Sequence, residues 1–504
     1  MPKTVIIIGA GIAGLATANL LAKAGYNVSV YEKNASIGGR AGRRVTKGFT
    51  FDTGPSWYLM PEVFNQYFSL FNIDIKRKLS IKQLTPAYKV FFESHKPLTI
   101  HGSLAKDAPQ FEAIEKGSGN ALRTYVKEGG EIYDMALSHF LYTNFSDARD
   151  VINGAVLKES PRMVKLLLTS IHSRVEQFVT AKPLQQILEY PMVFLGTSPF
   201  KAPAMYSLMS ALDFKEGVFY PAGGIYSIIE LLGSIGKKLG VHYHLRSDVQ
   251  SISYENGSAT GVMVDGSFVA ADIVISNADL HHTETKLLDA PARSYPQSSW
   301  DKKEAGISAL LMYIGVKGSL PQLEHHNLFF VDSWEQNFID IYESKTIPQS
   351  ASLYVSRTSA TDPSTAPKGH ENIFVLVPLP TGITLTKKQQ DTLTSRFVDQ
   401  ISTAIKEPHF KDRIVTLETF GPNDFMDTFN SWNGTALGMS HLLKQSAMFR
   451  IPNKSKKLKN LYYVGAGTVP GIGLPMCLIG AELVYKRITG IKRGGPVTQI
   501  EKIQ

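Results

Sequence analysis

The first 32 residues alternate between apolar runs and short polar or glycine-rich breaks. Residues 4–8, Thr-Val-Ile-Ile-Ile, form a continuous apolar run of the kind found in a strand that is buried on both faces. Residues 13–24 then carry apolar side chains at helical spacing, and residues 27–31 return to a strand pattern that ends at Glu32. This order predicts a strand, a crossover helix and a second, parallel strand.

Similar patterns recur in the middle and at the end of the chain. The further strands predicted are residues 242–252, 261–264, 268–271, 271–277, 309–316, 373–378 and 461–465. The further helices predicted are residues 119–144, 162–179, 225–239, 387–406 and 475–488. The Asn256-Gly257 pair between two of the strands predicts a hairpin turn. The alternation of strands and helices is typical of an α/β protein.

The turn after the first strand has the sequence Gly-Ala-Gly-Ile-Ala-Gly over residues 9–14, which binds a dinucleotide when a strand and a helix flank it. The glycines allow a tight turn, close approach of the pyrophosphate and close packing of helix on strand. The helix N-terminus offers free N–H groups to the phosphates. Glu32 lies 18 residues after Gly14 and is placed to accept hydrogen bonds from ribose hydroxyls. The contacts predicted here are Gly9, Gly11, Ala13, Gly14 and Glu32.

A second glycine pair followed by an arginine, Gly38-Gly39-Arg40, comes soon after Glu32. A nicotinamide dinucleotide has no need of it, whereas a flavin is longer and more buried and requires further close approaches of the backbone. Arg40 can supply positive charge to the diphosphate, and the alternative is an ordinary loop with a surface arginine. We therefore expect FAD as the cofactor. The further contacts predicted are Gly39, Arg40, Gly54, Pro55 and Ser56, with Val249 from a later strand.

Residues 465–473, Gly-Ala-Gly-Thr-Val-Pro-Gly-Ile-Gly, lead into a predicted helix. Pro475 suits the first helical turn, where its missing N–H costs no hydrogen bond. A helix N-terminus aimed at the flavin pyrimidine ring would stabilise the negative charge that develops when the ring accepts hydride. The alternative is a purely structural corner between strand and helix. The contacts predicted here are Gly467, Gly473, Leu474, Pro475 and Met476.

The motifs divide the chain into segments of two domains. Residues 1–60, 215–295 and 455–495 are expected to build a Rossmann-like FAD-binding domain of glutathione-reductase type. Residues 61–214 and 296–454 are expected to form an inserted α+β domain that binds the substrate and has a helical, membrane-facing part. With 504 residues, 43% of them hydrophobic, the chain is long enough for two such cores.

Charge and cysteine content narrow the functional classes. The chain has 53 Lys and Arg against 44 Asp and Glu, and the net charge of +9 favours an anionic membrane surface as partner. No basic cluster is interleaved with aromatic residues, so we expect no nucleic-acid partner. The single cysteine, Cys477, excludes an internal disulfide and a multi-cysteine metal site and fits a reducing cytoplasm. No uninterrupted apolar stretch of about 18 residues predicts a membrane span, so a soluble or peripheral protein is expected.

Four segments together resemble the bacterial-type phytoene desaturases, which are the carotenoid desaturase branch of the flavin amine oxidase-like enzymes. They are the amino-terminal glycine motif with Gly38-Gly39-Arg40, residues 52–56, residues 220–224 and residues 460–480. The most specific part is Asn-Leu-Tyr-Tyr-Val-Gly-Ala-Gly-Thr-Val-Pro-Gly-Ile-Gly-Leu-Pro, which begins at Asn460. Many members of the family have histidine before the first proline of this stretch, where this chain has Val469. A catalytic histidine at that position is therefore not expected.

The resemblance implies FAD-dependent desaturation of a long polyene by a cytoplasmic enzyme that associates peripherally with the membrane. Phytoene, converted to more conjugated carotenes such as lycopene, is the substrate that it implies. Hydride passes to the flavin, and oxygen or a quinone is the expected electron acceptor because no second nucleotide motif indicates an NAD(P)H site. The alternatives are a C30 diapophytoene or later-carotenoid desaturase, a carotene isomerase, another amine oxidase-like flavoenzyme, and a non-catalytic lipid-binding protein on the same fold.

No residue stands out as a catalytic acid or base. Arg149-Asp150 and His281-His282 are better explained as exposed salt-bridge or loop residues. His325-His326 does not indicate a metal site, because adjacent side chains of a strand point to opposite faces. Residues 162–179 have the pattern of an amphipathic helix that lies either at a membrane interface or against the core. The aromatic and aliphatic stretch 190–209 either lines a polyene tunnel or belongs to the core.

Overall fold

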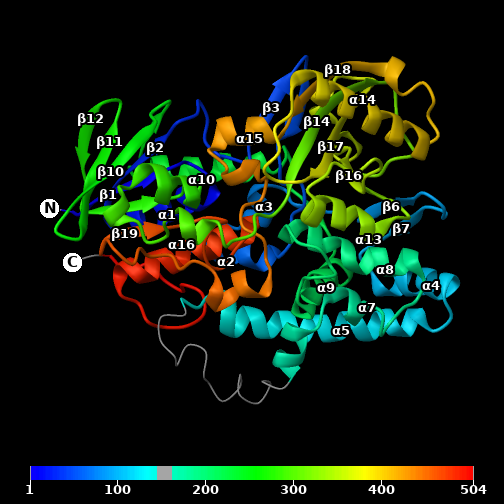
Figure 1. Ribbon diagram of the computed structural model, residues 1–504, viewed down its shortest axis with the longest axis horizontal. Coiled ribbons are helices and arrows are strands. Elements are labelled where there is room, and N and C mark those ends of the chain that lie inside the picture. Colours follow the sequence, from blue (N-terminus) through cyan, green and yellow to red (C-terminus); the bar gives the residue numbers. More distant parts are fainter. Residues whose placement is uncertain (1, 145–161, 503–504) are drawn as a thin grey trace.

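The computed structural model describes residues 2–144 and 162–502, which are arranged around two main β-sheets (Figure 1). The first sheet is parallel and has the strand order β19-β13-β1-β2-β9. Both ends and the middle of the chain contribute to it, which confirms the predicted Rossmann-like α/β fold. Its strands are β1 (Thr4–Ile8), β2 (Asn27–Glu32), β9 (His242–Leu245), β13 (Ile273–Ser276) and β19 (Leu461–Tyr463).

Both faces of this sheet are covered, which explains the unbroken apolar run of β1. Val5 and Ile7 pack against a layer of helices, whereas Ile6 and Ile8 point the other way and pack against a three-stranded antiparallel sheet. Alternate side chains of one strand therefore enter two separate cores. The covering elements are α1 (Ile12–Lys23), α10 (Tyr226–Lys238), α16 (Leu474–Thr489), β10 (Val249–Glu255), β11 (Ser258–Val264) and β12 (Ser267–Ala270).

The second main sheet has the strand order β18-β14-β17-β16-β15-β6-β7 and is antiparallel except between β15 and β6. One face packs against α14, and the other faces a helical layer that includes α5, α8 and α9 (Figure 1). The strands are β6 (Tyr88–Phe92), β7 (Leu98–Ile100), β14 (Ser308–Lys317), β15 (His326–Phe330), β16 (Leu353–Ser356), β17 (His370–Leu379) and β18 (Ile414–Phe420). The helices are α5 (Ser118–Met135), α8 (Lys182–Glu189), α9 (Ser207–Glu216) and α14 (Lys387–Ala404).

Helix α2 (Pro61–Ser69) belongs to the core of the first sheet. Its buried residues Phe64, Tyr67 and Phe68 pack together with residues of α1 and α16. The Tyr67 hydroxyl donates to the Ala16 carbonyl at 2.9 Å. The first helix after residue 60 thus packs with the cofactor-side layer, and the division of the chain into exact domain ranges stays a prediction.

Two predicted elements are wrong as single units. The strand predicted for residues 242–252 is split, because β9 ends at Leu245 and Arg246 has a φ of +55°, which turns the chain out of the parallel sheet before β10 begins. The helix predicted for residues 162–179 is also split. Residues 162–168 and α7 (Ile171–Val175) are helical, but Ser170 is extended and its side chain accepts a hydrogen bond from the Ser173 N–H at 3.1 Å. Ser170 therefore begins a new helix as an N-cap residue.

The predicted helix 119–144 is shorter than its pattern indicates. The α-helix α5 ends at Met135, and residues 136–141 continue with wider, π-type hydrogen bonding. Among the described residues, no helix is both long and apolar enough to cross a membrane.

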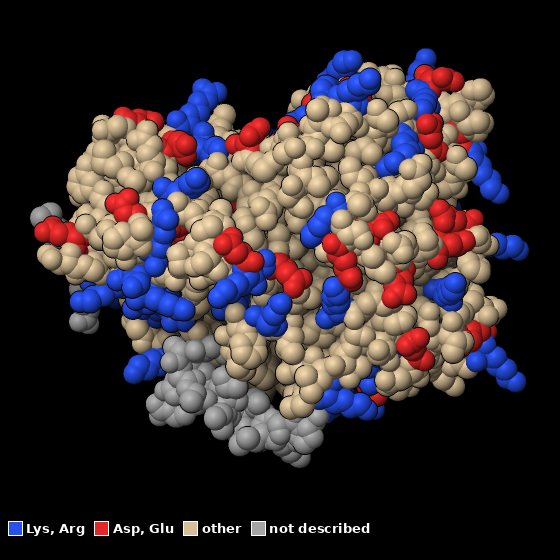
Figure 2. All heavy atoms as spheres, in the orientation of Figure 1, with Lys and Arg blue, Asp and Glu red and all other residues tan. Residues whose placement is uncertain are grey.

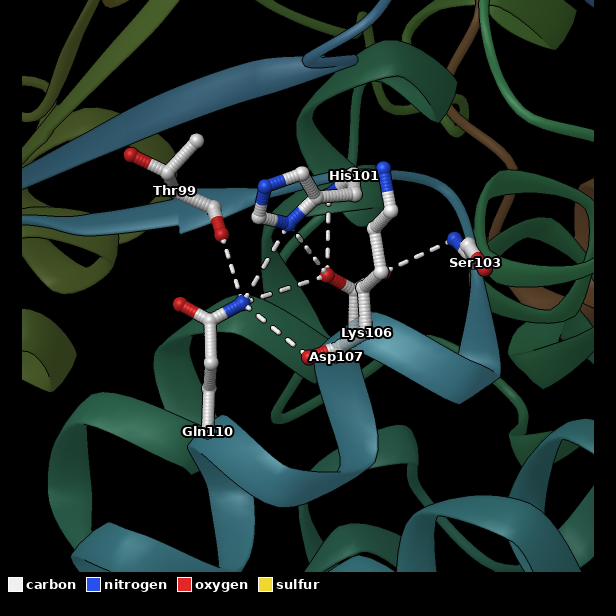
Figure 3. A network of polar contacts seen from close by, with 6 residues as sticks. All are labelled: Thr99, His101, Ser103, Lys106, Asp107 and Gln110. Atoms are coloured by element: carbon white, nitrogen blue, oxygen red, sulfur yellow. Dashed lines mark hydrogen bonds and ion pairs between the residues drawn. The ribbon is translucent and has the colours of Figure 1, made fainter.

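A buried carboxylate joins β7 to helix α4 (Leu104–Ile114) (Figure 3). Asp107 is fully buried and accepts hydrogen bonds from the His101 N–H at 2.8 Å and the Ser103 N–H at 2.9 Å. Gln110 and the His101 ring complete the network (Figure 3). The carboxylate thus replaces the hydrogen bonds that the backbone loses where the strand ends.

Replacing Asp107 by alanine is expected to lower the free energy of unfolding by about 2–5 kcal/mol, because two partly buried N–H groups lose their acceptor. Asp74 provides a matched control, since it accepts from the Arg77 N–H at 3.1 Å but lies exposed at the start of a short helix. D74A should lower the free energy of unfolding by about 1 kcal/mol. Chemical denaturation of both variants measures the difference, and equal losses would contradict the role given to Asp107.

Candidate active site

One cavity of about 800 Å³ lies between the two main sheets and is lined by residues of both. The structure brings to this cavity residues predicted from four separate segments of the chain. Only Gly14, which lies within α1, does not reach the lining. The predicted residues that border the cavity are Gly9, Gly11, Ala13, Glu32, Gly39, Arg40, Gly54, Pro55, Ser56, Val249, Gly467, Gly473, Leu474, Pro475 and Met476.

The turn between β1 and α1 is formed by chain segments that approach very closely. A Cβ atom on Gly14 would lie 2.3 Å from the Gly9 carbonyl oxygen, and one on Gly11 would lie 2.8 Å from Asn277 Nδ2. Asn277 follows β13 and donates from Nδ2 to the Gly9 carbonyl at 3.1 Å. Within the described part of the chain no side chain caps the N-terminus of α1, so its first N–H groups remain free for a ligand.

Glu32 is buried at the end of β2, and both of its oxygen atoms accept hydrogen bonds. Oε2 accepts from the Ala10 N–H at 2.8 Å, and Oε1 accepts from the Asn34 N–H at 2.9 Å. An ionised carboxylate has further lone pairs, so the predicted contact with ribose hydroxyls stays open. Glu32 also connects the glycine turn to β2, a role that the sequence did not indicate.

Arg40 lies in the cavity wall, not on an outer loop. Its Nη2 donates to Ser431 Oγ at 2.6 Å, and its side chain lies over the Phe429 ring at 5.6 Å. Burial lowers the pKa of Arg40, and the nearby Asp279 acts in the opposite direction. The Arg40 Nε atom is shielded from solvent and has no partner among the described residues. A cationic side chain that borders the cavity beside a glycine-rich turn fits a diphosphate group.

The carboxy-terminal glycine turn ends at the N-terminus of α16, which borders the cavity. The first hydrogen bond of the helix runs from the Cys477 N–H to the Gly473 carbonyl at 3.0 Å, and no side chain of the described residues caps the helix N-terminus. The positive end of the helix dipole therefore faces the cavity. Cys477 is buried there, and burial raises the pKa of its thiol to about 12, so the side chain is a protonated, weakly polar group.

Aromatic rings form the cavity wall beyond the glycine turns. The Tyr190 hydroxyl donates away from the cavity to Asp213 Oδ2 at 2.8 Å, and Trp334 Nε1 donates to Glu189 Oε2 at 2.6 Å. The rings therefore present apolar faces to the cavity, as a long hydrocarbon requires. The stretch 190–209 contributes both to this wall and to the core behind it. The aromatic residues of the wall are Trp57, Tyr190, Phe194, Phe330, Trp334 and Tyr354.

Burial raises the pKa of Asp213 from 3.8 to about 7, and hydrogen bonds from Tyr88 and Tyr190 oppose this rise. Between pH 4 and 7 the folded protein keeps the proton that the unfolded chain releases, so this group makes the protein less stable as pH rises through that window. Across this window the rise in pKa lowers the free energy of unfolding by roughly 4 kcal/mol.

Asp213→Asn is expected to remove this pH dependence. The free energy of unfolding of D213N, relative to wild type, should increase by up to roughly 4 kcal/mol between pH 4 and pH 8. Chemical denaturation at both pH values measures it. The exposed Asp301 serves as control, and D301N should follow the wild-type curve. A constant difference between D213N and wild type would show that Asp213 does not titrate in this window.

The two histidine pairs differ from their sequence interpretation. The His325 and His326 rings do not point apart but contact each other at 4.4 Å, because β15 begins only at His326. The His326 ring stacks on the Trp57 ring, with 4.6 Å between the ring centroids. Burial lowers the pKa of both histidines, so they are neutral.

His281 and His282, interpreted from the sequence as exposed, border the cavity. The pair Arg149-Asp150 lies outside the described residues. Among the described residues, no group of His, Cys, Asp and Glu side chains is arranged to hold a metal ion.

Sequence reasoning missed several residues of this site. Asn277 was detectable in principle, because a polar residue that follows a buried parallel strand lies where such folds bind ligands. Ser431 carries no local signal for its contact with Arg40, since the two residues are 391 positions apart. Asp213 and Tyr190 are joined only by tertiary packing.

These features together fit a flavin. The glycine turns leave no room for side chains, and the cationic Arg40 borders the same cavity as the N-termini of α1 and α16. Comparison with protein families supports the same conclusion, because the model of the flavin containing amine oxidoreductases matches residues 12–483. The chain belongs to this family and is a flavin-dependent oxidoreductase.

Its relatives place it in the carotenoid desaturase branch, as the sequence motifs predicted. The chain is 38% identical over 483 residues to the carotenoid 3,4-desaturase of Haloarcula japonica, covering 95% of this chain and 97% of that protein. It is 32% identical to the zeta-carotene-forming phytoene desaturase of Myxococcus xanthus, and the match covers 96% of this chain and 94% of that protein. A putrescine oxidase variant has the same fold, with a TM-score of 0.63 at 13% identity, covering 97% of this chain and 99% of that structure.

Proposed function

We propose that the protein uses FAD to introduce double bonds into a long carotenoid polyene, with phytoene as substrate and more conjugated carotenes such as lycopene as products. One observation carries the proposal. The glycine turns and the aromatic rings of Trp57, Tyr190 and Trp334 line one and the same cavity. An apolar chain can therefore lie against the cofactor without water between them.

The residues of the site then have separate tasks. The flavin supplies the hydride acceptor. Arg40 and the N-terminus of α1 would hold the diphosphate, and the N-terminus of α16 would stabilise negative charge on the flavin. The aromatic faces orient the polyene and stabilise positive charge on the carbon that loses hydride. We assign no catalytic base, because the neighbouring C–H of such a cation is acidic enough to lose its proton to water.

A second substrate has an observation in its favour. The relative with 38% identity is named a carotenoid 3,4-desaturase, whereas the phytoene desaturase of Myxococcus xanthus is 32% identical. A later carotenoid that is already conjugated is therefore the second candidate. Both substrates need the same apolar cavity. Which of them the protein uses therefore depends on how the cavity accommodates the two ends of the polyene.

We further propose that the substrate enters from a membrane and that oxygen or a quinone reoxidises the flavin. Large apolar side chains are exposed beside the cavity, with Leu168 76% and Phe449 59% exposed, and their neighbours Val164 and Met448 border the cavity itself. Lysines and arginines gather at the lower left of the face in Figure 2, over the region of α16. Apolar and basic side chains together favour peripheral association with an anionic bilayer in the cytoplasm.

Expression in a bacterium that accumulates phytoene tests the proposal. Pigments are extracted and analysed by chromatography and absorption, and bound flavin is measured on the purified protein. Neurosporene, lycopene or more desaturated products would support it, with a G14A variant as negative control. Unchanged phytoene with a flavin-loaded protein would exclude phytoene, and hosts that accumulate a C30 diapophytoene or lycopene would then test those substrates. A requirement for reduced flavin without net oxidation would indicate an isomerase.

A further inference from the structure

Arg450 is a buried cation beneath the carboxy-terminal glycine turn, and it has no anionic partner among the described residues. The side chain is 2% exposed. Its nitrogen atoms donate only to main-chain carbonyl groups, which are those of Met439 at 3.3 Å, Gln445 at 3.2 Å, Ala466 at 2.5 Å and Thr468 at 3.1 Å. Carbonyl dipoles satisfy its donors but do not cancel its charge.

The groups around Arg450 are neutral or positive. His441, which is buried, and Lys303 both have their pKa lowered first by burial and then by the Arg450 charge. Tyr206 is a further titratable neighbour, and burial raises the pKa of its hydroxyl, so it is neutral too. An isolated buried charge is costly, and side chains in such surroundings are concentrated at functional sites. Arg450 lies directly behind the cavity wall, because its acceptors Ala466 and Thr468 border the cavity.

Arg450 also orients the glycine turn. The Ala466 carbonyl points to the guanidinium, so the Gly467 N–H, on the opposite side of the same planar peptide, points away from it. Gly467 borders the cavity, and its N–H has no partner within the described part of the chain. His441 supports the same turn, because its Nε2 accepts from the Ile472 N–H at 3.2 Å.

The fit beneath the turn is close. A Cβ atom on Gly471 would lie 2.3 Å from His441 Cε1 and 3.6 Å from Arg450 Nε. The two side chains therefore occupy the space that a side chain at position 471 would need. Arg450, His441 and the turn that leads into α16 form one packed unit.

We propose that Arg450 is a positioning and electrostatic residue that makes the bound flavin a stronger hydride acceptor. Transfer of hydride from a substrate C–H bond brings two electrons and one proton to the flavin, which gains one negative charge, while the adjacent substrate carbon releases a proton to water. A nearby fixed cation favours this anionic, reduced form over the oxidised form. The proposal rests on the flavin binding proposed above.

Arg450→Met, compared with Arg450→Lys and Arg293→Met, tests the proposal. The reduction potential of each flavin-loaded protein is measured by equilibration with a reference dye. Arg293 is the matched control because it also donates to main-chain carbonyls, but its acceptors, Leu288 and Thr285, do not border the cavity as the Ala466 and Thr468 acceptors of Arg450 do. R450M should lower the equilibrium ratio of reduced to oxidised flavin at least tenfold. For a two-electron reduction this is a fall in the reduction potential of about 30 mV. R450K should lower it less, and R293M should not change it. A wild-type potential in R450M would overturn the proposal.

The wild-type protein gives an independent test if R450M does not fold or does not retain flavin. An anionic reduced flavin takes up one proton with two electrons, so the potential should fall by about 30 mV per pH unit between pH 5 and 6.5. A neutral reduced flavin takes up two protons and gives twice this slope, which would overturn the proposal. Absence of flavin from the wild-type protein would instead count against the proposed function. A flavin-loaded, active protein with the steeper slope would count against Arg450 alone.

Discussion

Replacement of Gly14 by alanine is expected to abolish flavin binding and to lower the free energy of unfolding by more than about 3 kcal/mol. The added Cβ would lie 2.3 Å from the Gly9 carbonyl oxygen and 2.9 Å from Asn277 Nδ2. The oxygen belongs to the backbone of the turn and cannot rotate away, so α1 has to move relative to β1. That movement displaces the free N–H groups at the start of α1.

Gly480→Ala is the matched control for this prediction. Gly480 is also buried in a helix of the same layer, but a Cβ there would meet its nearest atom at an ordinary 3.6 Å. Alanine is a better helix former than glycine, so G480A should keep its flavin and its stability. Flavin content from the absorption spectrum and thermal unfolding of both variants measure the contrast. Full flavin content in G14A would show that the close approach at the turn is not required for binding.

Arg40→Met is expected to weaken FAD binding by about 10- to 100-fold. The cationic side chain borders the cavity, and hydrogen bonds of charged groups contribute about 1.5–3 kcal/mol each. Titration of the apoprotein with FAD, followed by quenching of flavin fluorescence, gives the dissociation constant. Arg40→Lys, which keeps the charge but not the planar fork of donors, should lie between R40M and wild type.

Arg43 is the control in the same segment. It pairs with Glu230 at 3.0 Å on the surface, where both side chains are more than a third exposed, so R43M should change the affinity by less than about twofold. The thermal stability of the apoproteins separates binding from folding. R40M apoprotein should unfold within a few degrees of wild type, because Arg40 is only partly buried and its hydrogen bonds to Ser431 and Thr435 are lost together with the cost of desolvating its charge. Equal FAD affinities of R40M and R43M would contradict the role assigned to Arg40.

The cofactor side of the molecule was largely predictable from the sequence because its signals are local. The strand, glycine turn and helix of residues 4–24 and the turn before α16 require particular residue types within a few positions of one another. Pro475 lies in the first turn of α16, as its missing N–H predicts. Such positions depend on backbone geometry, which a short stretch of sequence specifies by itself.

Local patterns failed where a single residue changes the path of the chain. Arg246 turns the chain out of one sheet and into another, and Ser170 ends one helix and begins the next. Neither position has glycine or proline to mark the break. The apolar spacing continues through both breaks, so periodicity alone does not reveal them.

The sequence by itself determined the Rossmann-like fold, the flavin and the family, because glycine, proline and buried strands express backbone requirements that no distant residue can alter. Only the tertiary structure decided what surrounds the substrate and how the charges are distributed. Arg40 and Ser431, Tyr190 and Asp213, and Arg450 and the turn at Ala466 are brought together by folding. Burial then decides which of these groups carry charge, since the cost of ionisation depends on the solvent that the rest of the chain excludes.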